Sequence, residues 1–187
     1  MTRPIRSVCL YCGSRFGREP GYAEIARRFG RGVAEAGLRL VYGGGDVGLM
    51  GEAARAAVEA GAHVTGIIPK HIVDMEIATG PIANLVVTET MHERKKLMFM
   101  NSDAVVALPG GPGTLDELIE VLTWRQLGLH AKPVVIVNHE GYWDPLLAML
   151  EHIEDQGFMG ETFRGFYRVA ASPEEAIALL TRAGAPA

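Results

Sequence analysis

AVVALPGGPGTLDE, the stretch from Ala104 to Glu117, joins three local signals. A short apolar, β-branched run ends in a glycine-rich turn, and a helical pattern follows, which predicts a strand, an anion-binding loop and a helix. Glycines let a backbone approach a ligand closely because no Cβ stands in the way. The free N–H groups at the start of a helix favour an anion such as phosphate. We therefore expect a phosphate site here, with the Glu117 carboxylate one turn into the helix and within reach of the bound group.

The same residues also have a purely structural interpretation. Thr114 and Glu117 match a capping box, in which Thr114 is the N-cap and Glu117 folds back on it from position N3. Capping boxes are common and need no function. A cap does not require three glycines in the preceding turn, however, so we expect Glu117 to be positioned by the cap and also to act on the ligand.

Strand and helix patterns alternate along the chain on both sides of this stretch. This alternation predicts an α/β fold, a Rossmann-like doubly wound parallel sheet with helices on both faces. The chain contains no repeat, linker or low-complexity tract, so we expect residues 1–187 to form a single domain. The expected strands are 8–11, 38–42, 63–68, 84–88, 104–108 and 133–137; the expected helices are 22–36, 47–60, 91–102, 115–127, 142–156 and 173–183; the segment 71–83 is a candidate loop over the site.

A second glycine-rich turn, GGGDVG from Gly43 to Gly48, follows another expected strand. It formally matches the dinucleotide fingerprint G-x-G-x-x-G. In that fingerprint an acidic residue ends the next strand and binds a ribose hydroxyl. Pro69 and Lys70 stand there instead, which argues against NAD or FAD. We therefore favour the interpretation that this segment is a second turn facing a phosphate or a ribose. A tight turn with a purely structural role remains the alternative.

A charged run, MHERKK from Met91 to Lys96, opens an expected helix directly after a strand, at the same edge of the sheet. Such a run usually forms a solvated helix face. Arginine, however, binds phosphate with a fork of donors, and lysine supplies a point charge. The best chemical set in the chain is therefore Arg94, Glu117 and the glycine-rich turns. The histidines show no metal-ligand spacing, and no Gly-x-Ser-x-Gly motif supports a serine hydrolase.

Composition narrows the possible partners. The formal net charge is −4, so we expect no nucleic-acid surface. No apolar run approaches the ~20 residues that span a bilayer, and the N-terminus has no signal-peptide pattern, so we expect no membrane association and a cytoplasmic location. Cys9 and Cys12 lie three residues apart on an expected strand and so point to opposite faces. They are better explained as small buried residues than as a redox pair or half a zinc site.

Together these motifs carry a family resemblance. The segments are YCGS (11–14), YGGG (42–45), GLMG (48–51), MHERK (91–95) and PGGPGTLDE (109–117). In combination they closely resemble the LONELY GUY (LOG) family of cytokinin riboside 5′-monophosphate phosphoribohydrolases, which are often mislabelled lysine decarboxylases. The resemblance covers nearly the whole chain. Its most specific part is Pro-Gly-Gly-x-Gly-Thr-x-x-Glu combined with the upstream Arg-Lys pair.

The resemblance implies an enzyme that hydrolyses the N-glycosidic bond of an N6-substituted AMP, giving the free cytokinin base and ribose 5-phosphate. It further implies a Rossmann-like homodimer with its site near the subunit interface, without an organic cofactor or a metal ion. A general AMP nucleosidase and a non-catalytic nucleotide- or cofactor-binding protein remain alternatives. The residues implied as catalytic are Arg94 and Glu117. The expected substrate-binding residues are Gly13, Ser14, Gly44, Gly45, Glu76, Met91, Arg94, Lys95, Gly110, Gly111, Pro112, Gly113, Thr114, Leu115, Asp116, Glu117 and Thr123.

Overall fold

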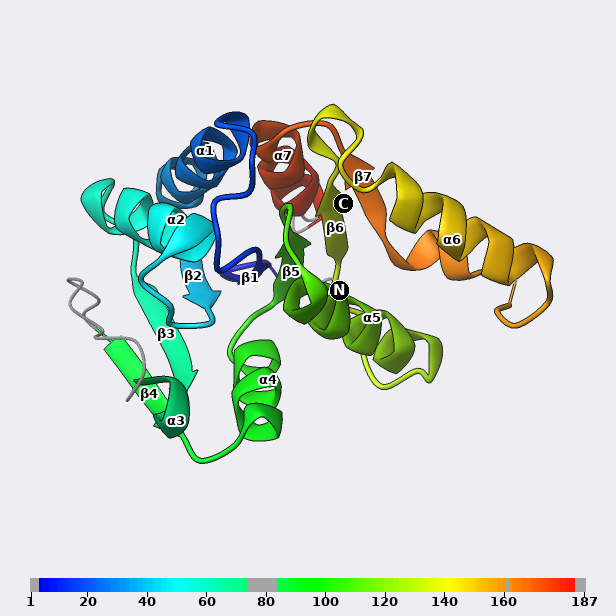
Figure 1. The fold of residues 1–187 in the computed structure, drawn as a ribbon, viewed down its shortest axis with the longest axis horizontal. Helices are drawn as coiled ribbons and strands as arrows, with labels where there is room; N and C mark the ends of the chain where they lie inside the picture. The colour runs from blue at the N-terminus through cyan, green and yellow to red at the C-terminus, as the bar shows by residue number, and fades with distance from the viewer. Residues whose placement is uncertain (1–3, 74–83, 161, 184–187) are drawn as a thin grey trace.

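The computed structural model describes residues 4–73, 84–160 and 162–183 and has a parallel β-sheet at its centre (Figure 1). The seven strands stand in the order β4-β3-β2-β1-β5-β6-β7, and every pair of neighbours is parallel. The strands are β1 (Ser7–Tyr11), β2 (Arg39–Tyr42), β3 (Val64–Pro69), β4 (Asn84–Thr88), β5 (Ala104–Ala107), β6 (Val134–Val137) and β7 (Arg168–Ala170).

Helices cover both faces of the sheet, as Figure 1 shows. One apolar core joins α1, α2 and α7 to one face, and a second core joins α4, α5 and α6 to the other. The expected α/β doubly wound fold is thereby confirmed. The helices are α1 (Gly21–Glu35), α2 (Gly48–Glu59), α3 (Lys70–Val73), α4 (Met91–Met100), α5 (Pro112–Gln126), α6 (Asp144–Asp155) and α7 (Pro173–Ala183), with short 3-10 turns η1 (His139–Gly141) and η2 (Phe163–Phe166).

The strand order reverses between β1 and β5. The chain builds outward from β1 to β4 and then returns, so that β5 pairs with β1 on the side away from β2. Loops that leave the carboxyl ends of two such strands diverge to opposite faces and open a crevice, where doubly wound sheets bind ligands. Gly13 and Pro109, which follow β1 and β5, are therefore placed at the ligand edge.

The start of α5 differs from the expectation. The capping box predicted at Thr114 and Glu117 is wrong, because the helix begins earlier, with Gly111 as N-cap and Pro112 in its first turn. Proline suits this position, since its φ is already helical and it lacks an N–H that would have no partner. A capping box does occur at α4, where the Thr90 hydroxyl accepts from the Glu93 N–H and the Glu93 carboxylate accepts from the Thr90 N–H.

Smaller differences concern short elements. β7 was not expected because three residues give no clear strand pattern. Residues 70–73 of the segment expected to be irregular form α3, and the rest of that segment, 74–83, lies outside the described residues. No helix among the described ranges is both long and apolar enough to cross a membrane.

The two cysteines behave as expected. Cys9 and Cys12 are both buried and free, and they belong to the cores on opposite faces of the sheet. Burial raises the pKa of the Cys9 thiol well above its ordinary value, so the thiol stays protonated. Both residues are therefore core side chains, as the strand geometry predicts.

Candidate active site

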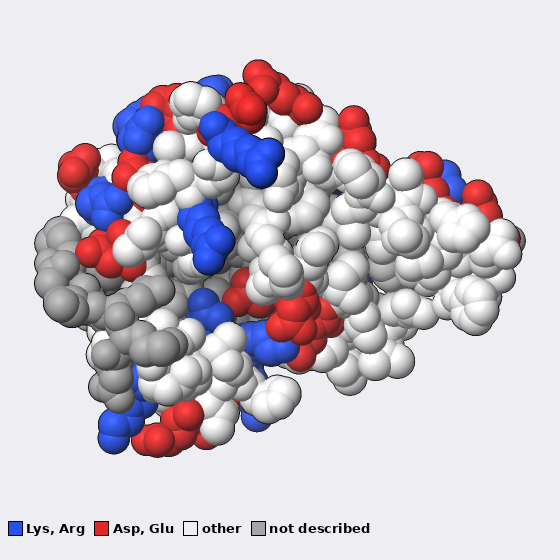
Figure 2. Space-filling model, viewed as in Figure 1, with Lys and Arg blue, Asp and Glu red and all other residues white. Residues whose placement is uncertain are grey.

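A cavity of about 530 Å³ opens at the carboxyl edge of the sheet, between the loops after β1, β2 and β5. Figure 2 shows acidic and basic side chains side by side in the hollow near the centre of this face. Several expected site residues line the cavity: Gly13, Ser14, Gly45, Arg94, Gly110–Thr114 and Glu117. The fold thus brings residues from four separate segments of the chain to one cavity.

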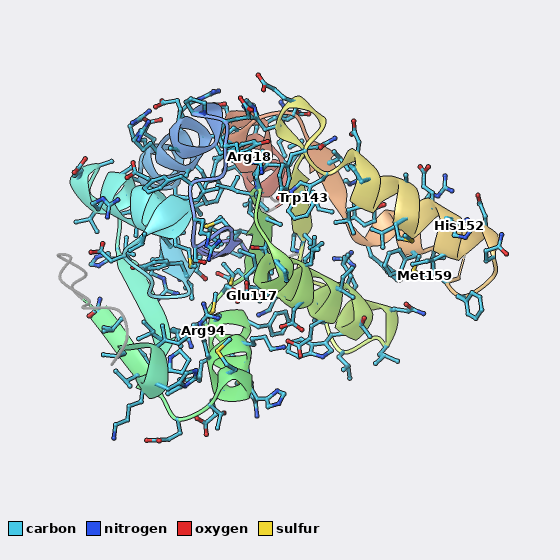
Figure 3. All side chains as sticks on the ribbon, viewed as in Figure 1. Arg18, Arg94, Glu117, Trp143, His152 and Met159 are labelled. Atoms are coloured by element: carbon cyan, nitrogen blue, oxygen red, sulfur yellow. The ribbon has the colours of Figure 1, made fainter. Side chains whose placement is uncertain are left out.

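Arg94 and Glu117 form a buried ion pair in the cavity wall (Figure 3). The Arg94 Nη1 donates to Glu117 Oε1 at 3.1 Å, and the two residues are 8% and 7% exposed. Arg94 lies one turn into α4 and Glu117 in the second turn of α5. Removing either partner would leave a buried charge without its counter-charge, so the pair is expected to act as one unit.

The backbone fixes the Arg94 guanidinium in its place. Its Nε donates to the carbonyl of Ile67 in β3 at 3.1 Å, and its Nη2 donates to the carbonyl of Gly43 at 3.3 Å. A Cβ on Gly43 would stand only 1.9 Å from Nη2. The first glycine of the GGGDVG turn is therefore required by the close approach of an arginine, which the fingerprint comparison did not foresee.

Burial controls the charge of Glu117. Loss of solvent raises the pKa of its carboxyl from 4.5 to about 7, and Arg94 opposes this rise by favouring the ionised form. A carboxyl group with this pKa exchanges protons readily near neutral pH. It can therefore serve as a general base or as a negative charge beside a developing cation.

The anion loop after β5 is held by bonds from two other segments. The Gly13 N–H donates to the Pro109 carbonyl at 3.0 Å, and the Tyr142 hydroxyl donates to the Gly110 carbonyl at 2.7 Å. The Thr114 hydroxyl packs so closely over Gly110 that a Cβ there would stand 2.1 Å from it. With these carbonyls engaged, the N-terminus of α5 borders the cavity, and the free N–H groups of a helix start favour an anion.

Lys95 lies beside this pair without lining the cavity. Its Nζ binds Asp116 at 3.0 Å and Glu120 at 3.2 Å. Burial lowers the pKa of Lys95, but the hydrogen bonds with the two carboxylates outweigh this effect and raise it. The three side chains connect α4 to α5 next to the Arg94–Glu117 pair, and they neutralise one another in part.

The other expected residues have different surroundings. Gly44 has a φ of +76° and packs against Ile68, and Leu115 is half-buried against the core. Met91 is exposed at the start of α4, and the exposed Thr123 bonds its hydroxyl to the Ile119 carbonyl within α5. Glu76 lies outside the described residues.

Several cavity residues were not predicted from the sequence, among them Phe16, Tyr22, Met50, Ile72 and Tyr142. Phe16 could have been found, since the GSRFG segment follows a strand at the ligand edge. Tyr142 gave no such signal, because its contact with Gly110 joins residues 32 positions apart.

The arrangement suits chemistry on an anionic ligand. A phosphate bound at the α5 N-terminus would fix one end of the ligand, and the Glu117 carboxylate would face a part farther along it. Among the residues that the structure describes, no group of three His, Cys, Asp or Glu side chains could hold a metal ion. The ionisable pair and the α5 N-terminus line the cavity.

A family model described as "Possible lysine decarboxylase" matches residues 50–180, more than half of the chain. The chain is 42% identical over 172 residues to the cytokinin riboside 5′-monophosphate phosphoribohydrolase LOG of Oryza sativa subsp. japonica, covering 92% of this chain and 71% of the relative. It is 42% identical over 175 residues to the phosphoribohydrolase LOG2 of Arabidopsis thaliana, covering 94% of this chain and 82% of that protein.

Solved structures with the same fold include carriers of a cofactor. The molybdenum cofactor binding protein of Rippkaea orientalis superposes with a TM-score of 0.70 at 26% identity, covering 97% of this chain and 98% of that one. The Moco carrier protein of Chlamydomonas reinhardtii gives a TM-score of 0.72 at 24% identity, with 97% of each chain covered, and supports the fold alone.

Proposed function

Because the chain belongs to the LOG family of cytokinin riboside 5′-monophosphate phosphoribohydrolases, we propose that its cavity hydrolyses the N-glycosidic bond of N6-substituted AMP. The products are the free cytokinin base and ribose 5-phosphate. The observation that carries this proposal is the buried Arg94–Glu117 pair, which lines the same cavity as the N-terminus of α5.

The loop after β5 and the α5 N-terminus would bind the 5′-phosphate. This contact would hold the ribose at a fixed distance from Glu117. Cleavage of the C1′–N9 bond builds positive charge on the ribose ring, as in other glycoside hydrolyses. The Glu117 carboxylate would stabilise that charge and accept a proton from the attacking water. The bond electrons leave with the base, which takes up a proton from solvent and is released neutral.

Arg94 would act mainly through Glu117. Its donors engage Glu117 and the carbonyls of Ile67 and Gly43, so it fixes the direction of the carboxylate and favours its ionised form. Gly44, Leu115 and Glu76 stay proposals as substrate contacts. The same holds for Met91, Lys95, Asp116 and Thr123, which lie outside the cavity of one chain. We assign them to the substrate through a homodimer, in which a partner subunit closes the site. The cytoplasmic location likewise remains a proposal.

The test is chromatography of the products that purified protein forms from isopentenyladenosine monophosphate. Free base and ribose 5-phosphate should appear in equal amounts. The same assay with AMP separates the proposal from a general AMP nucleosidase, which would cleave both nucleotides at similar rates. Absence of base from either nucleotide would leave binding as the function of the cavity.

Ligand binding without turnover is the second candidate function, and a structural comparison favours it. The Rippkaea orientalis protein, whose fold this chain shares, is a cofactor binding protein by name. A carrier would bind a nucleotide-like ligand and return it intact. The presence of both Arg94 and Glu117 in the cavity wall argues for turnover instead.

The family name "Possible lysine decarboxylase" points to lysine decarboxylation, which needs pyridoxal phosphate on a lysine. The donor set does not fit this cofactor, because no lysine is among the described residues that line the cavity. An absorption spectrum of the pure protein should therefore show no pyridoxal band.

A further inference from the structure

The cavity holds a cation that the proposed mechanism has not used. Arg94 and Lys95 are the arginine and lysine that the sequence analysis offered to a phosphate. Arg94 is bound to Glu117 and two carbonyls, and Lys95 is bound to Asp116 and Glu120. Neither side chain is thus available as a counter-charge for a substrate phosphate within the cavity of one chain.

The surroundings of Arg15 differ from those of Arg94 and Lys95. It lines the same cavity and is exposed to solvent. Within residues 4–73, 84–160 and 162–183, no hydrogen bond or ion pair engages its guanidinium. An arginine without a carboxylate partner keeps its full fork of donors, which matches the oxygens of a phosphate in a bidentate manner.

The backbone that carries Arg15 is rigid and tied to the anion loop. The Gly13 N–H donates to Pro109 at the start of that loop, and the Gly13 carbonyl accepts from the N–H groups of Leu49 and Met50 in α2. Gly48 packs so tightly here that a Cβ on it would stand 2.3 Å from the Ser14 carbonyl carbon. The turn from Gly13 to Arg15 is therefore fixed against both α2 and the loop before α5.

We infer that Arg15 binds the 5′-phosphate of the substrate together with the α5 N-terminus and thereby selects phosphorylated over unphosphorylated nucleosides. This inference rests on the proposed function for the identity of the substrate. The loop N–H groups provide dipoles only, and Arg15 provides the full positive charge. The role is one of binding and specificity, and the bond-breaking step is left to Glu117.

Arg15→Ser and Arg18→Ser form a matched pair for the test. Both remove one exposed arginine from the same segment, but Arg18 does not line the cavity, and Figure 3 shows it far from Arg94 and Glu117. Arg15→Ser should raise the KM for AMP about tenfold to a hundredfold, the range of one charge-assisted contact, with little change in kcat. Arg18→Ser should keep the KM of the unchanged protein, and Arg15→Lys should fall between the two.

Two further measurements separate specificity from folding. The kcat/KM for adenosine, which lacks the phosphate, should be the same in Arg15→Ser and the unchanged protein. Thermal unfolding should give equal melting temperatures for both serine variants. A loss that appears equally with AMP and adenosine, or equally in Arg15→Ser and Arg18→Ser, overturns the inference.

Calorimetric binding of ribose 5-phosphate tests Arg15 independently of turnover. Its affinity should fall in Arg15→Ser by the same factor as the KM for AMP rises, and it should not change in Arg18→Ser. If the unchanged protein releases no base, the proposed function fails while this binding difference still supports Arg15 as a phosphate ligand. Equal affinities in all three proteins, or no binding by any of them, overturn the inference.

Discussion

At the scale of single residues, the chemistry depends on the opposed effects that act on Glu117. Burial pushes its carboxyl toward the neutral form, and the guanidinium of Arg94 at 3.1 Å pulls it toward the ionised form. The result is a pKa of about 7, where the group can take up and release a proton under ordinary conditions. The same carboxyl in water would remain ionised and would be a much weaker base.

Replacing the carboxylate should stop turnover and leave binding intact. Glu117→Gln keeps the size of the side chain and an acceptor for Arg94, but it can no longer accept a proton. We expect kcat to fall by about a hundredfold to ten-thousandfold, the usual contribution of a general base. Calorimetry should show AMP binding within a few-fold of the unchanged protein. Glu35→Gln, the same change at an exposed residue at the end of α1 that does not line the cavity, is the control and should keep its activity.

The pH profile should report the same group. Below its pKa Glu117 is protonated and inactive as a base, and above it the carboxylate is ionised, so kcat should rise with pH through a midpoint near 7. We choose kcat because the substrate phosphate itself titrates near pH 6 and affects binding. Glu35→Gln, at an exposed residue that does not contribute to the shift of the Glu117 pKa, should keep this midpoint. A flat profile from pH 5 to 9 would mean that the ionisation of Glu117 does not govern the reaction.

At the scale of elements, the site depends on loops that leave parallel strands at one edge. Glycines in these loops serve two purposes that the sequence does not distinguish. Gly43 makes room for Arg94, whereas Gly110 makes room for the Thr114 hydroxyl. A motif search treats both as part of a phosphate loop, because only the contact in space reveals which neighbour each one accommodates.

Gly43→Ala should therefore impair a residue on another helix. The new Cβ would stand 1.9 Å from Arg94 Nη2 and force the guanidinium away from the Gly43 carbonyl and from Glu117. We expect kcat/KM to drop at least tenfold and the free energy of unfolding to fall by about 1–3 kcal/mol, as in other overpacked sites. Urea unfolding and steady-state kinetics measure both quantities.

The matching control is Gly160→Ala, where a Cβ would meet nothing within 4 Å. It should leave both quantities unchanged. If Gly43→Ala behaves like this control, the guanidinium is more mobile than its three hydrogen bonds imply, and the account of its placement fails.

The helix starts mark the limit of prediction at this scale. The strand from 104 and the helix after it were predicted from composition, but the helix was placed to begin at 115 and begins at Pro112. The pattern Thr114 to Glu117 suggested a cap, and a proline two residues earlier provided the true start. The capping box at Thr90 was not predicted, although Thr90 and Glu93 have the required spacing at the start of α4.

At the scale of the whole molecule, the fold could be predicted from periodicity, and the site only in part. Alternating strands and helices suffice for a doubly wound sheet, and its ligand edge follows from the parallel strands. The bonds of Arg94 to Ile67 and Gly43 depend on which strands become neighbours in the sheet, as does the contact of Tyr142 with Gly110. Such information is spread over distant segments and appears only when the chain is folded.

The proposed homodimer needs an apolar surface for its subunit contact. Large apolar side chains are exposed at Met100, Leu127 and Leu129, in the segments whose rings join Phe99 to Trp124 and His130. We propose these exposed side chains as the subunit contact, because exposed apolar surface favours association. Sedimentation should give a dimer, and Leu127→Glu with Leu129→Glu should shift the protein to monomers. Phe158→Glu, at another highly exposed residue, is the control and should leave the protein dimeric. If the unchanged protein sediments as a monomer, the proposed dimer is contradicted.

The central claim is that the cavity breaks a glycosidic bond with Glu117. The most direct measurement incubates the unchanged protein and Glu117→Gln separately with isopentenyladenosine monophosphate and quantifies base and ribose 5-phosphate in the same samples. The unchanged protein should release both products in equal amounts, and Glu117→Gln should release almost none while still binding AMP. Equal release by the two proteins, or no release by the unchanged one, would contradict the account.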